Sequence, residues 1–250
     1  MCQDPVVTPS DAPYFRPDLA LVHHLGFGFH AEACAPGILA LLEPVRERAG
    51  VVLELGCGSG LLTRYLIEAG HRVIATDASP AMVELAREHA AGAEDVRVLV
   101  LPDDPLPPAD AVVSVGHVVS YLADEAAVER ALRAIAAAVE PGGLFAVDIC
   151  DLEWGELRRE APNFSKVGDG WAMITRFEVP SPDRFVRHIT TFVRNDDGSW
   201  RRDDERHDNV LVDTAAIPAR LAAEGLDVTV GSSFGAETLP PGLRVLVGRR

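Results

Sequence analysis

The stretch Val51-Val52-Leu53-Glu54-Leu55-Gly56-Cys57-Gly58-Ser59-Gly60 decides the fold of this 250-residue chain. Its first five residues form a short apolar run broken by one acid, which is typical of a central parallel strand. The three glycines allow a tight turn and a close approach of the backbone to a ligand, because they carry no Cβ. A helical apolar stripe follows the turn: Leu61, Leu62, Tyr65 and Leu66. The stretch therefore predicts a buried strand that turns directly into a helix over 60–69.

The spacing of these glycines is G-x-G-x-G, which differs from the G-x-G-x-x-G of dinucleotide-binding turns. The longer form places a helix N-terminus against a pyrophosphate. The shorter form suits a nucleoside that has no phosphate. Asp77 ends the next apolar run, 72–76, at the point where an open α/β sheet places a carboxylate for ribose hydroxyls. Together these features predict a nucleoside ligand at the carboxyl ends of the first two strands.

The glycine turn, the acid after the second strand and Pro141-Gly142-Gly143 before the fifth strand occur in this order. In this arrangement the chain resembles the class I S-adenosylmethionine-dependent methyltransferases over about residues 35–250. The resemblance implies an α/β Rossmann-like fold with a doubly wound, seven-stranded mixed sheet. It also implies that the strands 226–230 and 244–247 form an antiparallel hairpin. The implied cofactor is S-adenosyl-L-methionine, with S-adenosyl-L-homocysteine as the product.

The resemblance also assigns cofactor contacts. Asp77 would hold the ribose, and Glu54 would accept a hydrogen bond from the loop backbone or from the cofactor amine. Met82 would lie against the adenine, with an ordinary core methionine as the alternative. The acid that follows the third strand, 96–101, is Asp103 or Asp104, and a solvated turn is equally open. The complete predicted cofactor-binding set is Glu54, Gly56, Cys57, Gly58, Gly60, Leu61, Asp77, Ala78, Met82, Pro102, Asp103 and Gly116.

The fourth strand, 109–115, leads into Gly116 and His117. Ligands of open α/β sheets bind beyond the carboxyl ends of the strands, where the strand order reverses. His117 is therefore the first candidate for a catalytic residue, and the alternative is a structural histidine satisfied by a carbonyl. His24 and His207 are reserve candidates. Asp148 and Asp151, near the end of the fifth strand, could serve the site or cap the segment 152–159.

The N-terminal part, 1–34, is predicted as an arm and a lid. Residues 1–18 are rich in Pro and Asp and have no periodicity, which indicates a flexible arm. The segment 19–30 is dense in histidine and aromatic residues, and it would cover the active site; a helix packed on the core is the alternative. A second helix is expected to start at Pro36.

Residues 170–212 alternate with the period of a strand. They predict a three-stranded antiparallel β insertion over 171–177, 184–192 and 200–210, which would form a roof over the substrate. The core is then 35–169 and 213–250. A solvated sheet with paired arginines is the alternative. The complete set of predicted substrate contacts is Tyr14, Phe27, Phe29, Tyr121, Trp171, Arg187 and Glu205.

The composition excludes several classes of partner. A net charge of −15 argues against binding to nucleic acid and to anionic membranes. The four cysteines show no C-x-x-C spacing, so free thiols are expected and a zinc site is not. No apolar run reaches 18 residues, and no cluster of metal ligands occurs. We therefore expect a cytoplasmic, metal-independent protein that is a monomer or homodimer.

The resulting hypothesis is methyl transfer to nitrogen or oxygen of a small molecule. The resemblance alone implies that the acceptor is a small metabolite or a natural-product intermediate. Proximity and orientation can supply roughly 7–11 kcal/mol of the barrier. A base would add roughly 10²–10⁴-fold where the acceptor must lose a proton. The acidic chain favours a cationic amine only weakly. The alternatives are a nicotinamide-dependent oxidoreductase and a non-catalytic, nucleoside-binding partner subunit.

Overall fold

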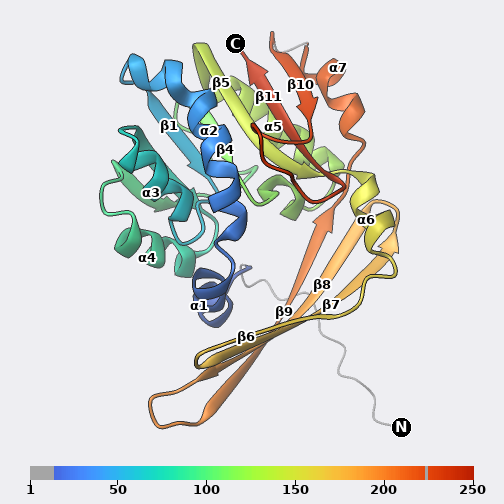
Figure 1. Cartoon of the computed structure of the whole chain (residues 1–250). Coiled ribbons are helices and arrows are strands. Elements are labelled where there is room, and N and C mark those ends of the chain that lie inside the picture. The colour runs from blue at the N-terminus through green and yellow to red at the C-terminus, as the bar shows by residue number, and fades with distance from the viewer. Residues whose placement is uncertain (1–13, 223–224) are drawn as a thin grey trace.

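The computed structural model describes residues 14–222 and 225–250 and contains two sheets (Figure 1). The larger has seven strands, parallel from β3 to β5 and antiparallel where β5, β11 and β10 pair. Its spatial order is β10(Asp227–Gly231), β11(Leu243–Arg249), β5(Val139–Cys150), β4(Ala109–Ser114), β1(Val51–Leu55), β2(Arg72–Asp77) and β3(Asp95–Val98). The order reverses between β1 and β4. The predicted seven-stranded mixed sheet, including its C-terminal hairpin, is confirmed.

Helices cover both faces of this sheet. On one face lie α2(Phe29–Glu47), α3(Leu61–Glu68) and α4(Pro80–His89), and on the other lie α5(Glu125–Ala138) and α7(Ile217–Leu221). Along β5, Leu144 and Ala146 face the first layer, whereas Phe145 and Val147 face the second. Because both faces are covered, the strands are continuous apolar runs. The shorter elements are η1(Val118–Tyr121), α6(Leu152–Arg158) and η2(Thr214–Ala216).

Side-chain caps mark the starts of two helices, and a third helix starts before its predicted position. Ser79 accepts a hydrogen bond from the Met82 N–H at 3.2 Å, and Asp124 accepts one from Ala127 at 2.8 Å. The helix expected to start at Pro36 instead starts at Phe29, so it crosses the predicted domain boundary at residue 34. The buried side chains around Pro36 explain this, because tertiary packing outweighs the hydrogen bond that a proline removes.

The insertion is a four-stranded antiparallel sheet, so the prediction of three strands was wrong. Its strands, in order, are β6(Phe164–Gly168), β7(Trp171–Ser181), β8(Arg184–Arg194) and β9(Trp200–Val210). The missed strand, β6, is a short and largely exposed edge strand, with Val167 78% exposed, so it carries no apolar alternation. The third predicted strand of the larger sheet was also too long, because β3 ends at Val98.

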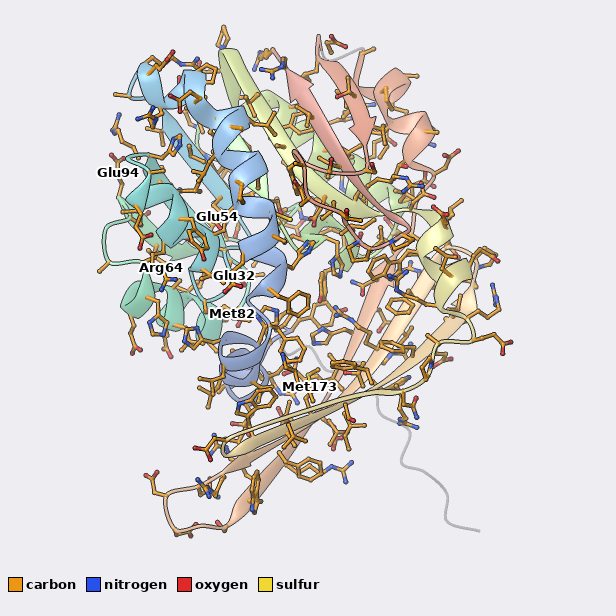
Figure 2. All side chains as sticks on the ribbon, in the orientation of Figure 1. Glu32, Glu54, Arg64, Met82, Glu94 and Met173 are labelled. Carbon is orange, nitrogen blue, oxygen red and sulfur yellow. The ribbon has the colours of Figure 1, made fainter. Side chains whose placement is uncertain are left out.

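Helix α1(Pro17–Gly26) lies between the larger sheet's helices and the insertion sheet (Figure 1). Leu19 and Val22 of α1 pack on Trp171 and Met173 of β7, and Figure 2 shows Met173 on the insertion sheet below this helix. Glycine is required at position 26, because a Cβ there would lie 2.5 Å from the Trp171 ring. The predicted N-terminal helix is thus observed, packed on the insertion.

Residues 1–13 of the predicted flexible arm, 1–18, lie outside the described residues. Residues 14–18 are held by hydrogen bonds and by the start of α1, so the prediction of flexibility was wrong for them. The N–H groups of Phe15 and Arg16 donate hydrogen bonds to the Glu205 carboxylate at 2.8 and 2.9 Å. Pro17 already begins α1. No single helix in the described ranges has the length and hydropathy needed to cross a membrane; α1 and α2 pass that test only as a pair, bent by 66°.

The packing of α1 predicts a large stability difference between two tryptophans of the insertion. Trp171 is 5% exposed beneath α1, whereas Trp200 on β9 is 53% exposed. Trp171→Ala should lower the free energy of unfolding by about 3–5 kcal/mol, because it leaves a cavity in this cluster. The control, Trp200→Ala, should change it by less than about 0.5 kcal/mol. Urea titrations measure both values, and equal effects would contradict the packing described for α1.

Candidate active site

The glycine turn after β1 is fixed by the acid at the end of β2. Gly56, Gly58 and Gly60 all have positive φ, at 67°, 55° and 83°. The Gly58 N–H donates to Asp77 Oδ2 at 2.9 Å, and the Ser79 N–H donates to Asp77 Oδ1 at 2.8 Å. Burial raises the pKa of Asp77, and these N–H groups oppose the rise. The carboxylate is therefore oriented beside the turn before any ligand arrives.

The same turn leaves room for a ligand. A Cβ placed on Gly58 would meet no atom within 4 Å, so the space in front of this residue is open. At Gly56 the reverse holds, because a Cβ would lie 2.2 Å from Val118 Cγ2. The first glycine thus allows close packing against η1, and the second borders an open volume where the ribose and methionine portions of a nucleoside could lie.

Glu54 lies beneath this turn, and Figure 2 labels it together with Met82. Its carboxylate accepts a hydrogen bond from the Thr63 hydroxyl of α3 at 2.7 Å, a partner that differs from the predicted loop backbone. Burial raises the pKa of Glu54 to about 8. Met82 is 2% exposed, which fits the core alternative as well as an adenine contact.

The remaining predicted cofactor residues differ in exposure. Cys57 is buried and Ala78 is exposed, while Leu61 lies at the start of α3. After β3, Asp103 and Asp104 are both exposed, and Asp104 already accepts the Val100 N–H at 2.8 Å. Of the two acids left open by the sequence, Asp103 is therefore the one whose carboxylate is not used by this turn.

A second carboxylate, Asp148 of β5, holds the turn after β4. It is fully buried and accepts hydrogen bonds from the N–H groups of His117 at 2.6 Å and Gly116 at 3.0 Å. Both of these residues have positive φ, at 51° for His117 and 102° for Gly116, a conformation that a histidine rarely adopts. Asp148 thus presents His117 at the end of β4. Asp151, in contrast, caps α6 by accepting the Glu153 N–H at 3.1 Å.

Asp148 also binds a histidine that the sequence did not single out. His30 Nε2, in the first turn of α2, lies 2.9 Å from Asp148 Oδ2. The two residues are 118 positions apart, so no spacing could have shown this pair. The only available signal was an acid inside the otherwise apolar run 144–150 of β5. Where His30 donates from Nε2 to this carboxylate, Nδ1 is the nitrogen that can accept a hydrogen bond or a proton.

His117 is a neutral imidazole in this structure. Burial, and after it the positive charge of Arg187, lowers the pKa of His117 to about 3. Its ring stacks on Tyr121 with centroids 5.7 Å apart, and it lies the same distance from Trp154. At neutral pH this side chain can accept a hydrogen bond, but it is a weak proton acceptor.

Several predicted residues from distant parts of the chain meet beside His117. The Tyr14 ring lies 5.2 Å from Tyr121 and 4.7 Å from His207, measured between centroids. Arg187 of β8 donates a hydrogen bond to the Tyr121 hydroxyl and lies over the same ring at 5.5 Å. The structure therefore brings together Tyr14, Tyr121, Arg187, His207 and His117, which come from the N-terminal segment, η1, the turn after β4 and two insertion strands.

Glu205 joins this cluster to the N-terminal segment. Besides the N–H groups of Phe15 and Arg16, its carboxylate accepts His207 Nε2 at 2.9 Å. The carbonyl of Phe15 in turn accepts the Ser79 hydroxyl at 2.7 Å. The backbone of Phe15 thus connects Glu205 of the insertion with Ser79, whose N–H group also orients Asp77. Glu205, His207 and Asn209 are all buried, so these alternate residues share one face of β9.

The other predicted residues lie outside this cluster. His24 Nδ1 is 2.9 Å from the Ser59 hydroxyl, and its ring stacks on His89 at 4.1 Å, so it lies at the glycine turn and away from His117. Phe27 packs beside Lys166, and Phe29 is 62% exposed. Trp171 is a core residue beneath α1. Within residues 14–222 and 225–250, no group of three or more His, Cys, Asp or Glu could hold a metal ion.

Comparisons with known proteins agree with the fold. A family described as a methyltransferase domain matches residues 52–143. The sugar N-methyltransferase KedS8 from a Streptoalloteichus species is 20% identical and superposes with a TM-score of 0.75, covering 100% of this chain and 98% of that one. Streptomyces venezuelae DesVI is 21% identical with a TM-score of 0.73, covering 93% and 97%.

Sequence relatives match shorter segments. A ubiquinone biosynthesis O-methyltransferase from Xanthomonas axonopodis pv. citri is 35% identical over 112 residues, which are 42% of this chain and 44% of that protein. A 2-heptyl-1-hydroxyquinolin-4(1H)-one methyltransferase from Mycobacteroides abscessus is 41% identical over 56 residues, 22% of this chain and 24% of that protein. The chain thus spans less than half of these curated relatives. The predicted class I methyltransferase fold is confirmed by the whole-chain structural likenesses.

The contacts of Glu205 predict a pH dependence of stability. Burial raises its pKa from 4.5 to about 7, against the effect of the Arg16 and Phe15 N–H groups. The folded protein therefore keeps a proton that the unfolded chain releases, and the free energy of unfolding should fall as the pH rises from about 4.5 to 7, by about 1–3 kcal/mol. Urea titrations at pH values across this range measure it.

Glu205→Gln is the matched control for this effect, because it keeps the side-chain shape and cannot titrate. The advantage of the wild type over the variant should be largest at the acidic end of the range and should shrink as Glu205 ionises. Parallel stability curves for the two proteins would contradict the raised pKa.

Proposed function

We propose that this chain, which carries a methyltransferase domain over residues 52–143 on a class I methyltransferase fold, transfers the methyl group of S-adenosylmethionine to a small molecule. The observation that carries the proposal is the open volume beside Gly58, bordered by an Asp77 carboxylate that two N–H groups hold in place. Such a carboxylate suits ribose hydroxyls, which need an acceptor of fixed orientation.

The residues present fit this cofactor. Asp77 would hold the ribose, and the turn from Gly56 to Gly60 would border the methionine portion. The raised pKa of Glu54 suits a group that ionises when a cationic amine arrives nearby. When bound, S-adenosylmethionine supplies an electrophilic methyl group, and the protein supplies binding, orientation and exclusion of water.

The protein's main task is to orient the acceptor. The rings of Tyr14, Tyr121 and His117 lie together where the turn after β4 meets the insertion, and they would contact the acceptor there. Holding the acceptor in line with the methyl group can supply roughly 7–11 kcal/mol of the barrier. The insertion sheet thereby serves as the roof of the site.

Proton removal falls to His30 more readily than to His117. The Asp148 carboxylate accepts a hydrogen bond from His30 Nε2. Nδ1 can therefore take a proton from the acceptor, while the carboxylate stabilises the resulting imidazolium. His117, whose pKa is lowered to about 3, would accept a hydrogen bond from the acceptor and help to position it. His24 and His207 are each bound to protein partners, Ser59 and Glu205.

The acceptor is proposed only by class. KedS8 is titled a sugar N-methyltransferase, and the Xanthomonas relative is named an O-methyltransferase, so small-molecule nitrogen and oxygen acceptors are both candidates. The cytoplasmic location, the monomeric or homodimeric state and the independence from metals remain predictions from the sequence.

Removal of the ribose carboxylate tests the cofactor assignment. Asp77→Ala should weaken S-adenosylhomocysteine binding by about tenfold or more, because charge-assisted hydrogen bonds to the ribose are lost. Isothermal titration calorimetry measures the affinity. Asp95→Ala is the control, since Asp95 is a partly exposed residue of β3 that pairs with Arg97.

Unchanged affinity in Asp77→Ala would contradict the ribose assignment. A wild-type protein that binds NAD and does not bind S-adenosylhomocysteine would support the nicotinamide-dependent alternative. Binding without methyl transfer to any of a panel of metabolites would support the non-catalytic subunit.

The roles of the two histidines predict different losses of activity. His30→Ala should lower kcat by about 10²-fold or more where the acceptor must lose a proton, and His117→Ala should lower it less. Both variants should bind S-adenosylhomocysteine as the wild type does. A labelled-methyl transfer assay measures the rates, with His188→Ala as the control, because His188 pairs with Glu178 on the outer part of the insertion. Full activity of His30→Ala would exclude it as the base.

A further inference from the structure

Arg187 of β8 is a half-buried cation with an unusual set of neighbours. One of its nitrogens donates to the Tyr121 hydroxyl, and the guanidinium lies over the same ring. Its Nε is buried and has no hydrogen-bond partner among the described residues. No carboxylate in residues 14–222 and 225–250 lies within ion-pair distance of it, although most other arginines of the insertion are paired.

The groups around Arg187 do not balance its charge. His207 lies directly opposite it in the β8–β9 ladder, and His117 lies beside Tyr121. Arg187 is the largest charge contribution that lowers the pKa of His117, His207 and His23, so these imidazoles are neutral. Burial raises the pKa of Tyr121, so this phenol is neutral as well.

The two buried acids of the region are already used. Asp148 accepts three hydrogen bonds, from Gly116, His117 and His30. Glu205 accepts three, from Phe15, Arg16 and His207. A buried charge that lacks a partner is costly, so proteins retain one where a ligand supplies the opposite charge.

We infer that Arg187 binds an anionic oxygen group of the methyl acceptor, a carboxylate or a phosphate, with its free Nε and a neighbouring nitrogen. The guanidinium is planar and matches two oxygens of such a group. This inference rests on the proposed function and narrows its substrate class. It also replaces the preference for a cationic amine, because the net charge of −15 describes the whole chain, whereas Arg187 places a guanidinium with an unpaired Nε at the site.

The cofactor itself carries a carboxylate, on its methionine portion, and is the other source of this chemistry. Arg187 lies with His117 and Tyr121 beyond the end of β4, whereas the open volume for the cofactor lies at Gly58 after β1. The acceptor is therefore the better match, and the affinity for S-adenosylhomocysteine distinguishes the two sources.

The test compares anionic with neutral probes. Calorimetric titrations of benzoate, its neutral analogue benzamide and inorganic phosphate, in buffer of low chloride, are performed on the wild type and on Arg187→Met. We expect the wild type to bind benzoate or phosphate in preference to benzamide, and Arg187→Met to lose this binding by about tenfold or more. Arg176→Met is the matched control, because Arg176 is an exposed arginine on β7 of the same sheet.

Two further readouts keep the result interpretable. Arg187→Met without ligand should unfold at or above the wild-type temperature, because it removes a half-buried cation whose Nε is buried without a hydrogen-bond partner. Arg187→Lys keeps the charge and should retain part of the anion binding. It serves as the test variant if Arg187→Met does not fold. S-adenosylhomocysteine affinity should be unchanged in both variants.

The inference is overturned when the wild type shows no preference for the anions, or when Arg187→Met binds them as the wild type does. A tenfold loss of S-adenosylhomocysteine affinity in Arg187→Met also overturns it, because Arg187 would then serve the cofactor. A wild type that binds the anions and fails to bind S-adenosylhomocysteine would contradict the proposed function alone, since the anion titrations need no cofactor.

Discussion

The hydrogen bond from the Gly58 N–H to the Asp77 carboxylate joins the two features on which the site depends. One is the glycine turn after β1, whose positive φ angles no ordinary side chain adopts easily. The other is the acid at the end of β2. Because the same carboxylate also accepts the Ser79 N–H, the turn and the start of α4 are held together. The nucleoside site is therefore formed by backbone geometry before a ligand binds, which lowers the cost of binding.

Two further carboxylates also hold backbone N–H groups in place, in other parts of the candidate site. Asp148 fixes the turn that carries His117 and binds His30, and Glu205 binds the backbone that leads into α1. Through Phe15 and Ser79, the insertion sheet and the cofactor side of the larger sheet share one chain of hydrogen bonds. Hydrogen bonds thus connect the proposed roof over the substrate with the proposed nucleoside site. Among the described residues, no carboxylate lies within ion-pair distance of Arg187.

The sequence predicted the parts of the fold that depend on local patterns. The strand from Val51 to Leu55, the caps at Ser79 and Asp124 and the acid at position 77 each carry a signal within a few residues. The edge strand β6 has no such signal, because its side chains are mostly exposed. The hydrogen bond between Phe15 and Glu205 could not be predicted either, because the two residues are 190 positions apart.

The same limit applies to the site. Cofactor residues near the glycine turn could be proposed because their spacing is short, whereas the pairing of His30 with Asp148 and the missing partner of Arg187 appear only in three dimensions. A crystal structure with S-adenosylhomocysteine is the most direct test of the central claim. Ribose hydroxyls within hydrogen-bond distance of the Asp77 carboxylate, with the ligand beside Gly58, are the predicted result. A ligand bound elsewhere, or a site closed by protein side chains, would contradict it.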